Sequence, residues 1–318
     1  MRKIRRRKKN IESETRLIFD GNALGYAAFH AYGDLEDDLG NPTAVIFGFI
    51  RLILAIQEKL NGDEWIFCWD SRKSFRKDIY PQYKASREEN KTEDELAKRR
   101  SAHEQFTKLR KEVIPALGFA NNFISPGYEG DDLMAAILDD VDPYKNILCT
   151  SDNDMFQCLD DCDIYHLATK KMFTRNDFMK KFKIWPEQWA EAKAIGGCNG
   201  DGVFGIEGVA DPKKNTSKAL KYLNDDLNKG IILNRIESTE GQEIIRRNLR
   251  LVKLPFEGKT PIKFKLGPNE LSKEKFEEVF EKYRFISLLE KKMFQRYIKA
   301  FKIKDGGENG RTIRRRKK

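Results

Sequence analysis

Three short apolar segments that each end in aspartate constrain the fold of this chain more than any other feature of its sequence. They cover residues 16–20, 65–70 and 146–152. Each is brief and largely apolar, which is typical of a strand buried on both faces of a sheet. Apolar residues at helical spacing over 43–60 predict one connecting helix, and acids at the start of 129–141 with Pro143 after its end predict another. Strands that alternate with helices predict a parallel sheet with crossover connections.

The expected fold class is therefore α/β, with a central, mostly parallel sheet flanked by helices. Residues 122–125 and 163–167 are candidates for two further strands. The stretch 71–110 is dense in Lys, Arg and Glu, so we expect a surface insertion that does not contribute to the core. After Trp185 the pattern becomes mainly helical, which predicts a helical C-terminal region.

The expected organisation places a basic tail at each end of the folded body. The α/β domain is expected over 15–194, with the insertion inside it, and the helical region over 195–305, between tails at 1–14 and 306–318. The basic runs within these tails contain thirteen Lys and Arg residues, which leaves 47 cations against 50 acids in the rest of the chain. Such tails suit contact with a polyanion such as nucleic acid, or serve only as solubilising ends.

The composition argues against several classes of protein. No apolar run approaches the roughly 20 residues that span a bilayer, and the first basic residues are not followed by the apolar segment of a secretory signal. The five cysteines form no C-x-x-C pair and the chain has three histidines, so neither a disulfide framework nor a zinc site of the usual kind is expected. We expect a cytoplasmic protein with reduced thiols.

Acidic residues follow the predicted strands in a pattern that suggests a common site. The carboxyl ends of parallel strands meet at one edge of a sheet, which is where open α/β folds bind ligands. Further acids open the helix at 129–141, and one lies in a glycine-rich stretch. The full set is Asp20, Asp70, Glu129, Asp131, Asp132, Asp152, Asp154 and Asp201.

Any one of these acids has a structural explanation. Acids in a first helical turn are favoured by capping and by the helix dipole, and an aspartate after a strand is often a turn residue. As a group they are different, because carboxylates gathered on one rim repel each other unless cations neutralise them. Oxygen ligands suit Mg²⁺ or Mn²⁺, and a pair of such ions about 4 Å apart can promote phosphodiester hydrolysis.

At these residues the chain resembles the 5′-nuclease superfamily, which includes phage flap endonucleases and the 5′-nuclease domain of bacterial DNA polymerase I. The matching blocks are 17–22 (LIFDGN), 69–70 (WD), 75–76 (FR), 83–87 (YKASR), 127–132 (GYEGDD), 150–157 (TSDNDMFQ) and 248–255 (NLRLVKLP). They occur in the family's order over about residues 15–260. The resemblance implies a PIN-like 5′-nuclease fold in which the insertion at 71–110 forms a helical arch. It also implies an origin in a bacterial cell or in the cytoplasm of a phage-infected host.

The resemblance also implies roles for individual residues. All eight acids would bind two Mg²⁺ or Mn²⁺ ions, with Asp20, Asp70, Glu129 and Asp132 nearer the first ion, Asp152, Asp154 and Asp201 nearer the second, and Asp131 between them. Lys84 and Arg87 would neutralise the scissile phosphate, or they lie on a solvated helix face. Tyr83 would stack on a terminal base, or it packs the helix. The expected nucleic-acid contacts are Arg72, Lys73, Arg76, Lys77, Tyr83, Lys84, Arg87, Lys213, Lys214 and Lys218.

Two departures from the family pattern stand out in the glycine-rich region. Cys198 replaces the first aspartate of the family's Gly-Asp-x-x-Asp motif, and a thiol is a poor Mg²⁺ ligand. In the next hairpin Ala210 replaces a glycine, which makes a positive φ costly and weakens the case for the K⁺ ion that the family binds there. Lys213, Lys214 and Lys218 would compensate with phosphate contacts.

The expected function is that of a structure-specific 5′-nuclease, a 5′-3′ exonuclease or flap endonuclease that acts in DNA replication or repair, with removal of RNA primers as one variant. Its partners would be DNA or RNA·DNA with a free 5′ end and proteins of replication, and the chain is expected to be a monomer. One alternative is a nucleic-acid-binding protein of the same fold with weak or lost catalysis. The other is a hydrolase of small phosphate esters, or a PIN-like ribonuclease.

Overall fold

The chain folds into two compact units, each assembled from stretches that are distant in sequence. The computed structural model describes residues 14–85, 92–139, 144–209, 212 and 217–303. Unit 1 comprises 1–24, 62–98 and 123–265, and unit 2 comprises 25–61, 99–122 and 266–318. Most of the expected α/β domain and the first part of the expected helical region thus lie together in unit 1.

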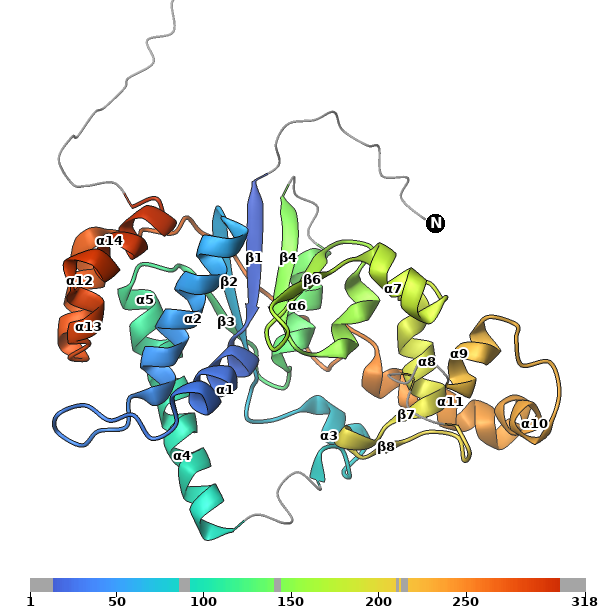
Figure 1. Cartoon of the computed structure of the whole chain (residues 1–318). Coiled ribbons are helices and arrows are strands. Elements are labelled where there is room, and N and C mark those ends of the chain that lie inside the picture. Colours follow the sequence, from blue (N-terminus) through green and yellow to red (C-terminus); the bar gives the residue numbers. More distant parts are fainter. Residues whose placement is uncertain (1–13, 86–91, 140–143, 210–211, 213–216, 304–318) are drawn as a thin grey trace, which may run out of the picture. The chain divides into compact units, whose positions relative to one another are not determined.

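A six-stranded sheet organises the chain (Figure 1). Its strands are β1 (Thr15–Asp20), β2 (Glu64–Trp69), β3 (Asn121–Ile124), β4 (Lys145–Thr150), β5 (Asp163–His166) and β6 (Lys171–Phe173). The strand order is β3-β2-β1-β4-β5-β6. The pairs β1–β2, β1–β4 and β4–β5 are parallel, and β6 pairs with β5 in the antiparallel direction. The expected mostly parallel sheet is confirmed, and the short antiparallel edge strand β6 is an addition that the sequence pattern did not predict.

The strand order fixes where a ligand site can form. The chain proceeds outward from β1 to β2 and β3, then returns to the other side of β1 to form β4 and β5. The order therefore reverses between β1 and β4, and open sheets of this kind bind ligands beyond the carboxyl ends of the strands at that point. Asp20 ends β1 and Asp152 follows β4 by two residues, so both lie at the reversal.

The central strands are buried because their side chains are apolar on both faces. Leu17, Ile18 and Phe19 of β1 are fully buried, and Phe19 stacks on Phe67 of β2 with ring centroids 5.0 Å apart. A strand covered on both faces reads as a continuous apolar run, and this is the pattern that revealed these strands in the sequence. The rigid core holds the strand ends, and thus the aspartates, in fixed positions.

Unit 1 carries most of the helices around the site. They are α3 (Phe75–Ile79), α6 (Gly130–Leu138), η3 (Asn153–Cys158), α7 (Arg175–Phe182), η4 (Pro186–Gln188), α8 (Trp189–Gly196), η5 (Asn199–Asp201), α9 (Lys218–Leu223), α10 (Ile231–Glu237) and α11 (Thr239–Val252). A two-stranded antiparallel ribbon, β7 (Gly197–Cys198) with β8 (Val203–Phe204), follows α8. Two helices cross the division between the units: α1 (Gly21–Tyr32) and α4 (Glu93–Lys108).

A second small core in unit 1 joins α8, α9, α10, α11 and the ribbon. Ala194, Ile195, Ile236 and Leu251 are almost fully buried within it. Asn248 of α11 fastens these elements, since its amide nitrogen donates hydrogen bonds of 2.9 Å to the carbonyl oxygens of both Ala194 and Phe204. The end of α8 is thereby fixed where the chain enters the glycine-rich stretch.

Unit 2 is mainly helical. It contains α2 (Ala44–Leu60), η2 (Leu109–Val113), α5 (Ile114–Ala116), α12 (Lys273–Lys282), α13 (Ile286–Leu289) and α14 (Lys291–Ala300). The helix expected at 43–60 is confirmed as α2, and the periodic residues that predicted it are largely buried. It packs on α14, where Gln57 donates a 3.0 Å hydrogen bond to the carbonyl oxygen of Ala300.

The charged stretch 71–110 contributes to both cores, contrary to expectation. Arg76 and Tyr83 are buried in unit 1, and Ala102 and Phe106 are buried in unit 2. The prediction was wrong because the average charge of a segment hides single residues that point inward.

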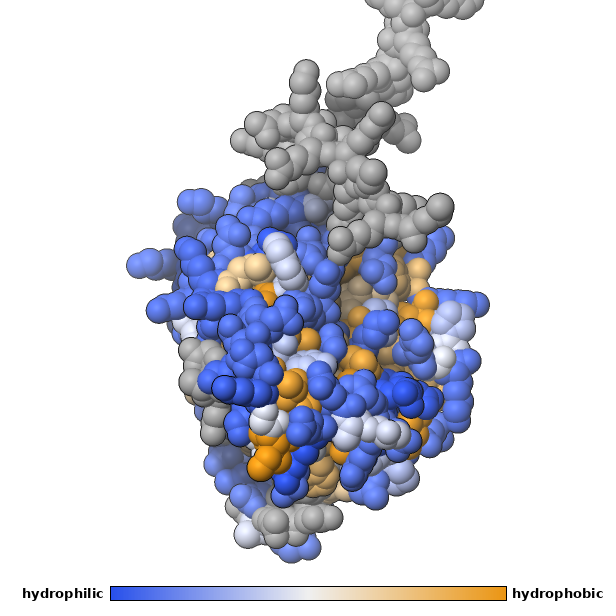
Figure 2. All heavy atoms as spheres, turned by 90° about the vertical axis from the view of Figure 1, so that its right-hand side faces the viewer, coloured by the Kyte–Doolittle hydropathy of each residue, from blue (hydrophilic) through white to orange (hydrophobic). Residues whose placement is uncertain are grey.

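In the described part of the chain no helix has the length and apolarity that a membrane crossing requires. Figure 2 shows the side of the molecule that carries α8 to α11. Hydrophilic residues cover most of it, and hydrophobic ones occupy small separate areas. Such a surface is suited to water or to a polar partner.

Candidate active site

Asp20 and Asp70 form the part of the site that belongs to the first two strands. One Asp20 oxygen accepts a 2.8 Å hydrogen bond from the amide of Ala23, and the other accepts a 2.9 Å bond from the hydroxyl of Thr150 on β4. Asp70 accepts a 2.7 Å bond from the amide of Gly130, at the start of α6. Burial and the nearby charge of Asp70 raise the pKa of Asp20 to about 7.

Glu129 connects α6 with the segment that follows α3. Its Oε2 atom accepts a 2.6 Å hydrogen bond from Lys84 Nζ and a 3.0 Å bond from the Tyr83 hydroxyl. Burial disfavours the charged carboxylate, but Lys84 and Arg76 outweigh this effect and lower the pKa of Glu129. Asp131 has no comparable compensation, because burial and the charge of Asp132 raise its pKa well above the usual value.

Asp132 is a fully buried carboxylate with several protein hydrogen-bond donors. Its two oxygens accept hydrogen bonds of 2.6 and 2.7 Å from Arg76, one of 3.0 Å from the Glu129 amide and one of 2.8 Å from the Phe256 amide. These four bonds occupy the capacity of a carboxylate, and its side chain is fully buried. Asp132 thus has protein donors for all four bonds, and its expected position nearer the first ion stays a prediction.

Arg76 is likewise not available as a phosphate contact. Besides binding Asp132, it donates a 2.7 Å hydrogen bond to the carbonyl oxygen of Leu251, and its guanidinium lies 4.8 Å from the ring centroid of Phe256. Only 2% of its side chain is exposed. The sequence correctly predicted that Arg76 lies beside the acids. It did not predict that Arg76 is buried, because one of its partners, Leu251, lies 175 positions away in the chain.

The other half of the site surrounds Asp154. Asp152 accepts a 2.8 Å hydrogen bond from the Asp154 amide, and burial together with the Asp154 charge raises the pKa of Asp152 to about 6. Lys193 of α8, which is 1% exposed, places Nζ 2.9 Å from Asp154 Oδ1. The Cys198 sulfur lies 3.8 Å from Asp154 Oδ2. Burial and Asp154 raise the pKa of this thiol to about 12.

The two halves meet at Lys84. Its backbone amide donates a 2.8 Å hydrogen bond to the carbonyl oxygen of Asp201, while its ammonium binds Glu129. Lys84 has a left-handed φ of 55°. The next residue after Asp201 must be glycine, since Gly202 has φ of 69° and a Cβ there would lie 2.8 Å from the carbonyl oxygen of Gln82.

These donors fit divalent cations. The ligand atoms of Asp154, Cys198 and Asp201 lie within 4.8 Å of one another. Burial first, and then the charges of Asp70 and Asp154, raise the pKa values of Asp20 and Asp152, so a bound cation would favour the ionised form of both carboxylates. Carboxylate oxygens are suitable ligands for Mg²⁺ or Mn²⁺, whereas the Cys198 thiol departs from an all-oxygen set.

The structure distinguishes the residues that were expected to touch nucleic acid. Tyr83 is 4% exposed and packs in the second core of unit 1, so its ring cannot stack on a base and the packing alternative is correct. The side chains of Arg72, Lys73, Lys77 and Lys218 are exposed. Arg87, Lys213, Lys214 and Ala210 lie outside the described residues.

Sequence reasoning missed Lys193, which contacts Asp154, and Phe204, which lies on the strand paired with Gly197 and Cys198. Lys193 is the only cation within the apolar helix α8, a pattern that could have marked it as a buried partner of an acid. Phe204, on the strand next to Cys198, is 62% exposed. Its backbone is held by Asn248 and by Arg247, whose guanidinium donates a 3.0 Å hydrogen bond to the Phe204 carbonyl oxygen. An exposed aromatic three residues after an expected metal ligand was a usable signal.

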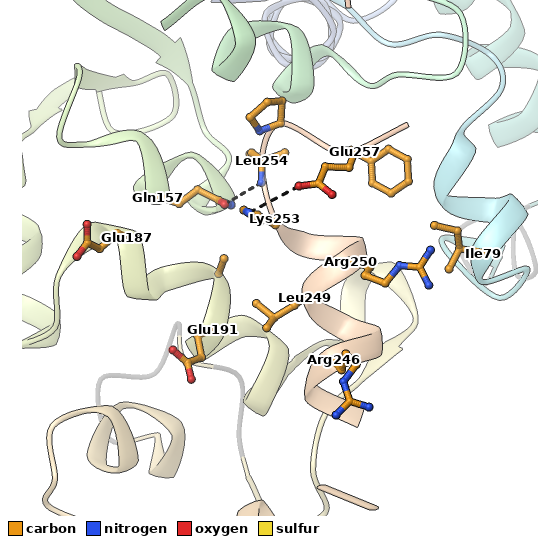
Figure 3. Close-up of a pocket in the computed structure, with 13 residues that line it drawn as sticks. Ile79, Gln157, Glu187, Glu191, Arg246, Leu249, Arg250, Lys253, Leu254 and Glu257 are labelled. Carbon is orange, nitrogen blue, oxygen red and sulfur yellow. Dashed lines mark hydrogen bonds and ion pairs between the residues drawn. The ribbon is translucent and has the colours of Figure 1, made fainter. Parts of the chain in front are cut away.

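Unit 1 also contains a pocket of about 650 Å³, and none of the eight candidate site acids lines it (Figure 3). It is lined by Ile79, Gln157, Glu187, Ala190, Glu191, Arg246, Leu249, Arg250, Lys253, Leu254, Pro255, Phe256 and Glu257. Gln157 joins it to η3, since its side chain donates to the Val252 carbonyl oxygen (3.1 Å) and accepts from the Leu254 amide (2.9 Å). Phe256, which also lines this pocket, donates its backbone amide to Asp132. The pocket therefore shares one residue with the hydrogen-bond network of Asp132.

Comparison with known proteins agrees with this geometry. In fold, the chain matches the bacteriophage T5 D15 flap endonuclease in a complex with DNA and metal ions, with a TM-score of 0.63, 23% identity, and coverage of 76% of this chain and 90% of that one. This similarity establishes the fold: a mostly parallel sheet flanked by helices, of the PIN-like 5′-nuclease type.

Residues 15–183 match the family described as 5′-3′ exonuclease, N-terminal resolvase-like domain, and the chain belongs to this family. Curated relatives include DNA polymerase I of Thermus aquaticus, 30% identical over 200 residues, and DNA polymerase I of Caldicellulosiruptor bescii, 26% identical over 302 residues. These alignments cover 61% and 86% of this chain but 22% and 33% of the polymerases. The chain therefore corresponds to a minor part of those proteins.

Proposed function

We propose that this chain is a metal-dependent 5′-nuclease that hydrolyses phosphodiester bonds near a free 5′ end of DNA or of RNA paired with DNA. The observation that carries the proposal is the convergence of Asp20, Asp70, Glu129, Asp152 and Asp154 around one end of the sheet, with raised pKa values at Asp20 and Asp152. Family membership supports the nuclease class. The DNA and metal ions bound to the T5 relative support the substrate and cofactor classes.

The acids would hold two divalent ions, which in such sites supply positive charge to the attacking and leaving oxygens of a phosphodiester. Asp20, Asp70, Glu129 and Asp131 would serve one position, and Asp152, Asp154 and Asp201 the other. Asp132 acts indirectly, because it accepts the Glu129 amide and anchors Arg76. The protein thereby fixes Glu129 before substrate binds, which limits reorganisation during the reaction.

Lys84 is proposed to contact the scissile phosphate. Burial opposes its charge, but Glu129, Asp201 and Asp131 raise its pKa well above the usual value, so the ammonium remains charged throughout the working range of pH. Its side chain retains 23% exposure, which leaves part of it accessible from the surface. The proposal extends to Arg87 on sequence grounds alone. Arg72, Lys73, Lys77 and Lys218 are proposed contacts along the nucleic-acid backbone, because exposed cations interact with phosphates irrespective of sequence.

A second candidate function is nucleic-acid binding with weak catalysis. The observation that favours it is local: Lys193 already neutralises Asp154 at 2.9 Å, and Cys198 offers a thiol where the family has a carboxylate. Both features reduce the attraction of this half of the site for a hard cation such as Mg²⁺. The nuclease and the binding protein would both bind nucleic acid with a free 5′ end. The rate of cleavage distinguishes these two candidate functions.

The test is cleavage of 5′-flap DNA and RNA·DNA oligonucleotides with Mg²⁺, with Mn²⁺ and with a chelator, by the wild-type chain and by Asp20→Asn and Asp154→Asn. We expect cleavage that requires the metal and that falls at least 100-fold in both variants. Asp160→Asn is the matched control, since Asp160 is an exposed partner of Arg175, and it should cleave at the wild-type rate. Tight binding without cleavage would establish the second candidate instead.

A further inference from the structure

We propose that the half-site of Asp154, Cys198 and Asp201 selects a divalent ion that accepts sulfur, of the Zn²⁺ and Cd²⁺ class, over Mg²⁺. This inference rests on the proposed metal-dependent function and specifies which ions one half of the site binds. It starts from the sequence departure at Cys198, where the family pattern has an aspartate. It depends on the position that the fold gives to the Cys198 sulfur.

The geometry is that of ligands around a single ion. The Cys198 sulfur and Asp154 Oδ2 are 3.8 Å apart, whereas ligands at about 2.0 Å (oxygen) and 2.3 Å (sulfur) from one tetrahedral ion lie about 3.5 Å from each other. A small rotation of either side chain closes the difference. The Asp201 carboxylate lies within 4.8 Å of both, so a third ligand is present.

Lys193 directs this arrangement. Its ammonium lies 2.9 Å from Asp154 Oδ1, and the other oxygen of the same carboxylate is the one that faces the thiol. Lys193 also makes a side-chain hydrogen bond with Cys198, so one ammonium holds both Asp154 and Cys198 in place beside Asp201. Lys193 is 1% exposed and belongs to α8, so the packing of that helix fixes where the lysine meets these two side chains.

The protein also fixes the sulfur itself. Cys198 is 5% exposed and belongs to the second core of unit 1. The ribbon pairs it with Val203, and Asn248 fixes the adjoining backbone at Ala194 and Phe204. The sulfur is therefore held in one position before an ion binds. Thiolate ligands prefer Zn²⁺ and Cd²⁺ to Mg²⁺.

The test uses Cd²⁺ alone as the probe and follows the ultraviolet absorption band that a cadmium–thiolate bond produces. The full-length chain is stripped of metal under reducing conditions and titrated, in parallel with Cys198→Ser and Cys158→Ser. Cys158 lies on η3, the element that carries Asp154, but does not belong to the three-residue group. We expect the absorption band in the wild type and in Cys158→Ser but not in Cys198→Ser. The affinity of Cys198→Ser for Cd²⁺ should be about 10-fold to 100-fold lower than that of the wild type.

Two results would overturn the proposal: no band in the wild type, or a band that persists in Cys198→Ser. Asp201→Asn keeps every cysteine, and it should weaken Cd²⁺ binding at least tenfold while its melting temperature stays near that of the wild type. Equal affinity in this variant would contradict the proposal even if Cys198→Ser fails to fold.

Nuclease activity is measured separately with Mn²⁺ on a 5′-flap substrate. A band without cleavage leaves this inference standing and defeats the proposed function, and cleavage without a band does the reverse. Cys198→Asp restores the family ligand, so it should lose the cadmium–thiolate band and require at least tenfold less Mg²⁺ for half-maximal cleavage. An unchanged Mg²⁺ requirement would mean that Cys198 does not determine the choice of ion.

Discussion

Arg76 and Asp132 form a bidentate ion pair, with hydrogen bonds of 2.6 and 2.7 Å between two side chains that are both almost fully buried. The pair connects α3 to α6 and, through the amide of Phe256 and the carbonyl oxygen of Leu251, to the segment after α11. Removing one member of a buried pair leaves an uncompensated charge, which is far more costly than the loss of an exposed pair.

We therefore expect Asp132→Asn to lower the free energy of unfolding by about 3–5 kcal/mol. Urea denaturation in the absence of metal measures this change. Asp78→Asn is the control, since Asp78 pairs with Lys259 at 2.7 Å between two exposed side chains, and it should cost at most about 1 kcal/mol. Equal losses in the two variants would show that Asp132 is not structural.

Tyr83 is predicted to support Glu129 and not to stack on a base. Tyr83→Phe removes only the hydroxyl that donates 3.0 Å to Glu129, so stability should fall by about 0.5–1.5 kcal/mol. Affinity for single-stranded DNA should stay within about twofold of the wild type, because the ring is buried in either case. Fluorescence anisotropy with a labelled oligonucleotide in Ca²⁺ measures the affinity. A large loss would restore the stacking role.

Phe204 is the aromatic residue that we expect to contact a base. Phe204→Ala should weaken binding of a single-stranded 5′ end by about 1–3 kcal/mol, the usual contribution of one stacked base, without changing stability. Ile231→Ala removes another exposed apolar side chain of unit 1 and should leave affinity unchanged. Substrates with abasic positions supply the decisive comparison. If Phe204→Ala weakens binding to them as much as to normal DNA, stacking is not its role.

Lys84→Ala is expected to slow cleavage by about 100-fold to 1000-fold, the usual cost of removing one group that stabilises developing charge. Saturating substrate and single-turnover conditions separate the rate of cleavage from binding. Lys171→Ala, at an exposed position on β6, is the control for loss of a cation. A fall in affinity with no change in the single-turnover rate would assign Lys84 to binding alone.

The acidic site predicts an unusual dependence of stability on pH in the absence of divalent ions. Asp20 has its pKa raised from 3.8 to about 7, and Asp152 from 3.8 to about 6. Between about pH 4 and pH 7 these two carboxyl groups bind more protons in the folded chain than in the unfolded chain, so their contribution to the free energy of unfolding falls as the pH rises.

Thermal melts between pH 4 and pH 7 in the presence of a chelator should show a melting temperature that declines as the pH rises. The decline should be smaller in Asp20→Asn than in the wild type. Divalent ions should reverse it, because they stabilise the ionised acids of the folded state alone. If Asp20→Asn leaves the pH dependence of the melting temperature unchanged, the raised pKa of Asp20 does not contribute to it.

The sequence by itself determined the sheet and the position of most acids. Short runs that are apolar on both sides predict buried strands, and parallel strands bring their carboxyl ends to one edge, so Asp20, Asp70 and Asp152 could be placed together before the structure was known. These inferences depend on local patterns and on the regular geometry of a sheet. Short sequence blocks in a fixed order also revealed the resemblance to the 5′-nuclease family. That resemblance predicted which acids belong to the site.

Only the tertiary structure decided which of these groups are already paired. Asp132 binds Arg76, 56 residues away, and the Phe256 amide, 124 residues away, and Tyr83 and Lys193 are buried by helices from other parts of the chain. Whether a carboxylate is a metal ligand or half of a buried ion pair depends on where its counter-charge lies in space. Long-range packing sets that position, and no local spacing along the sequence records it.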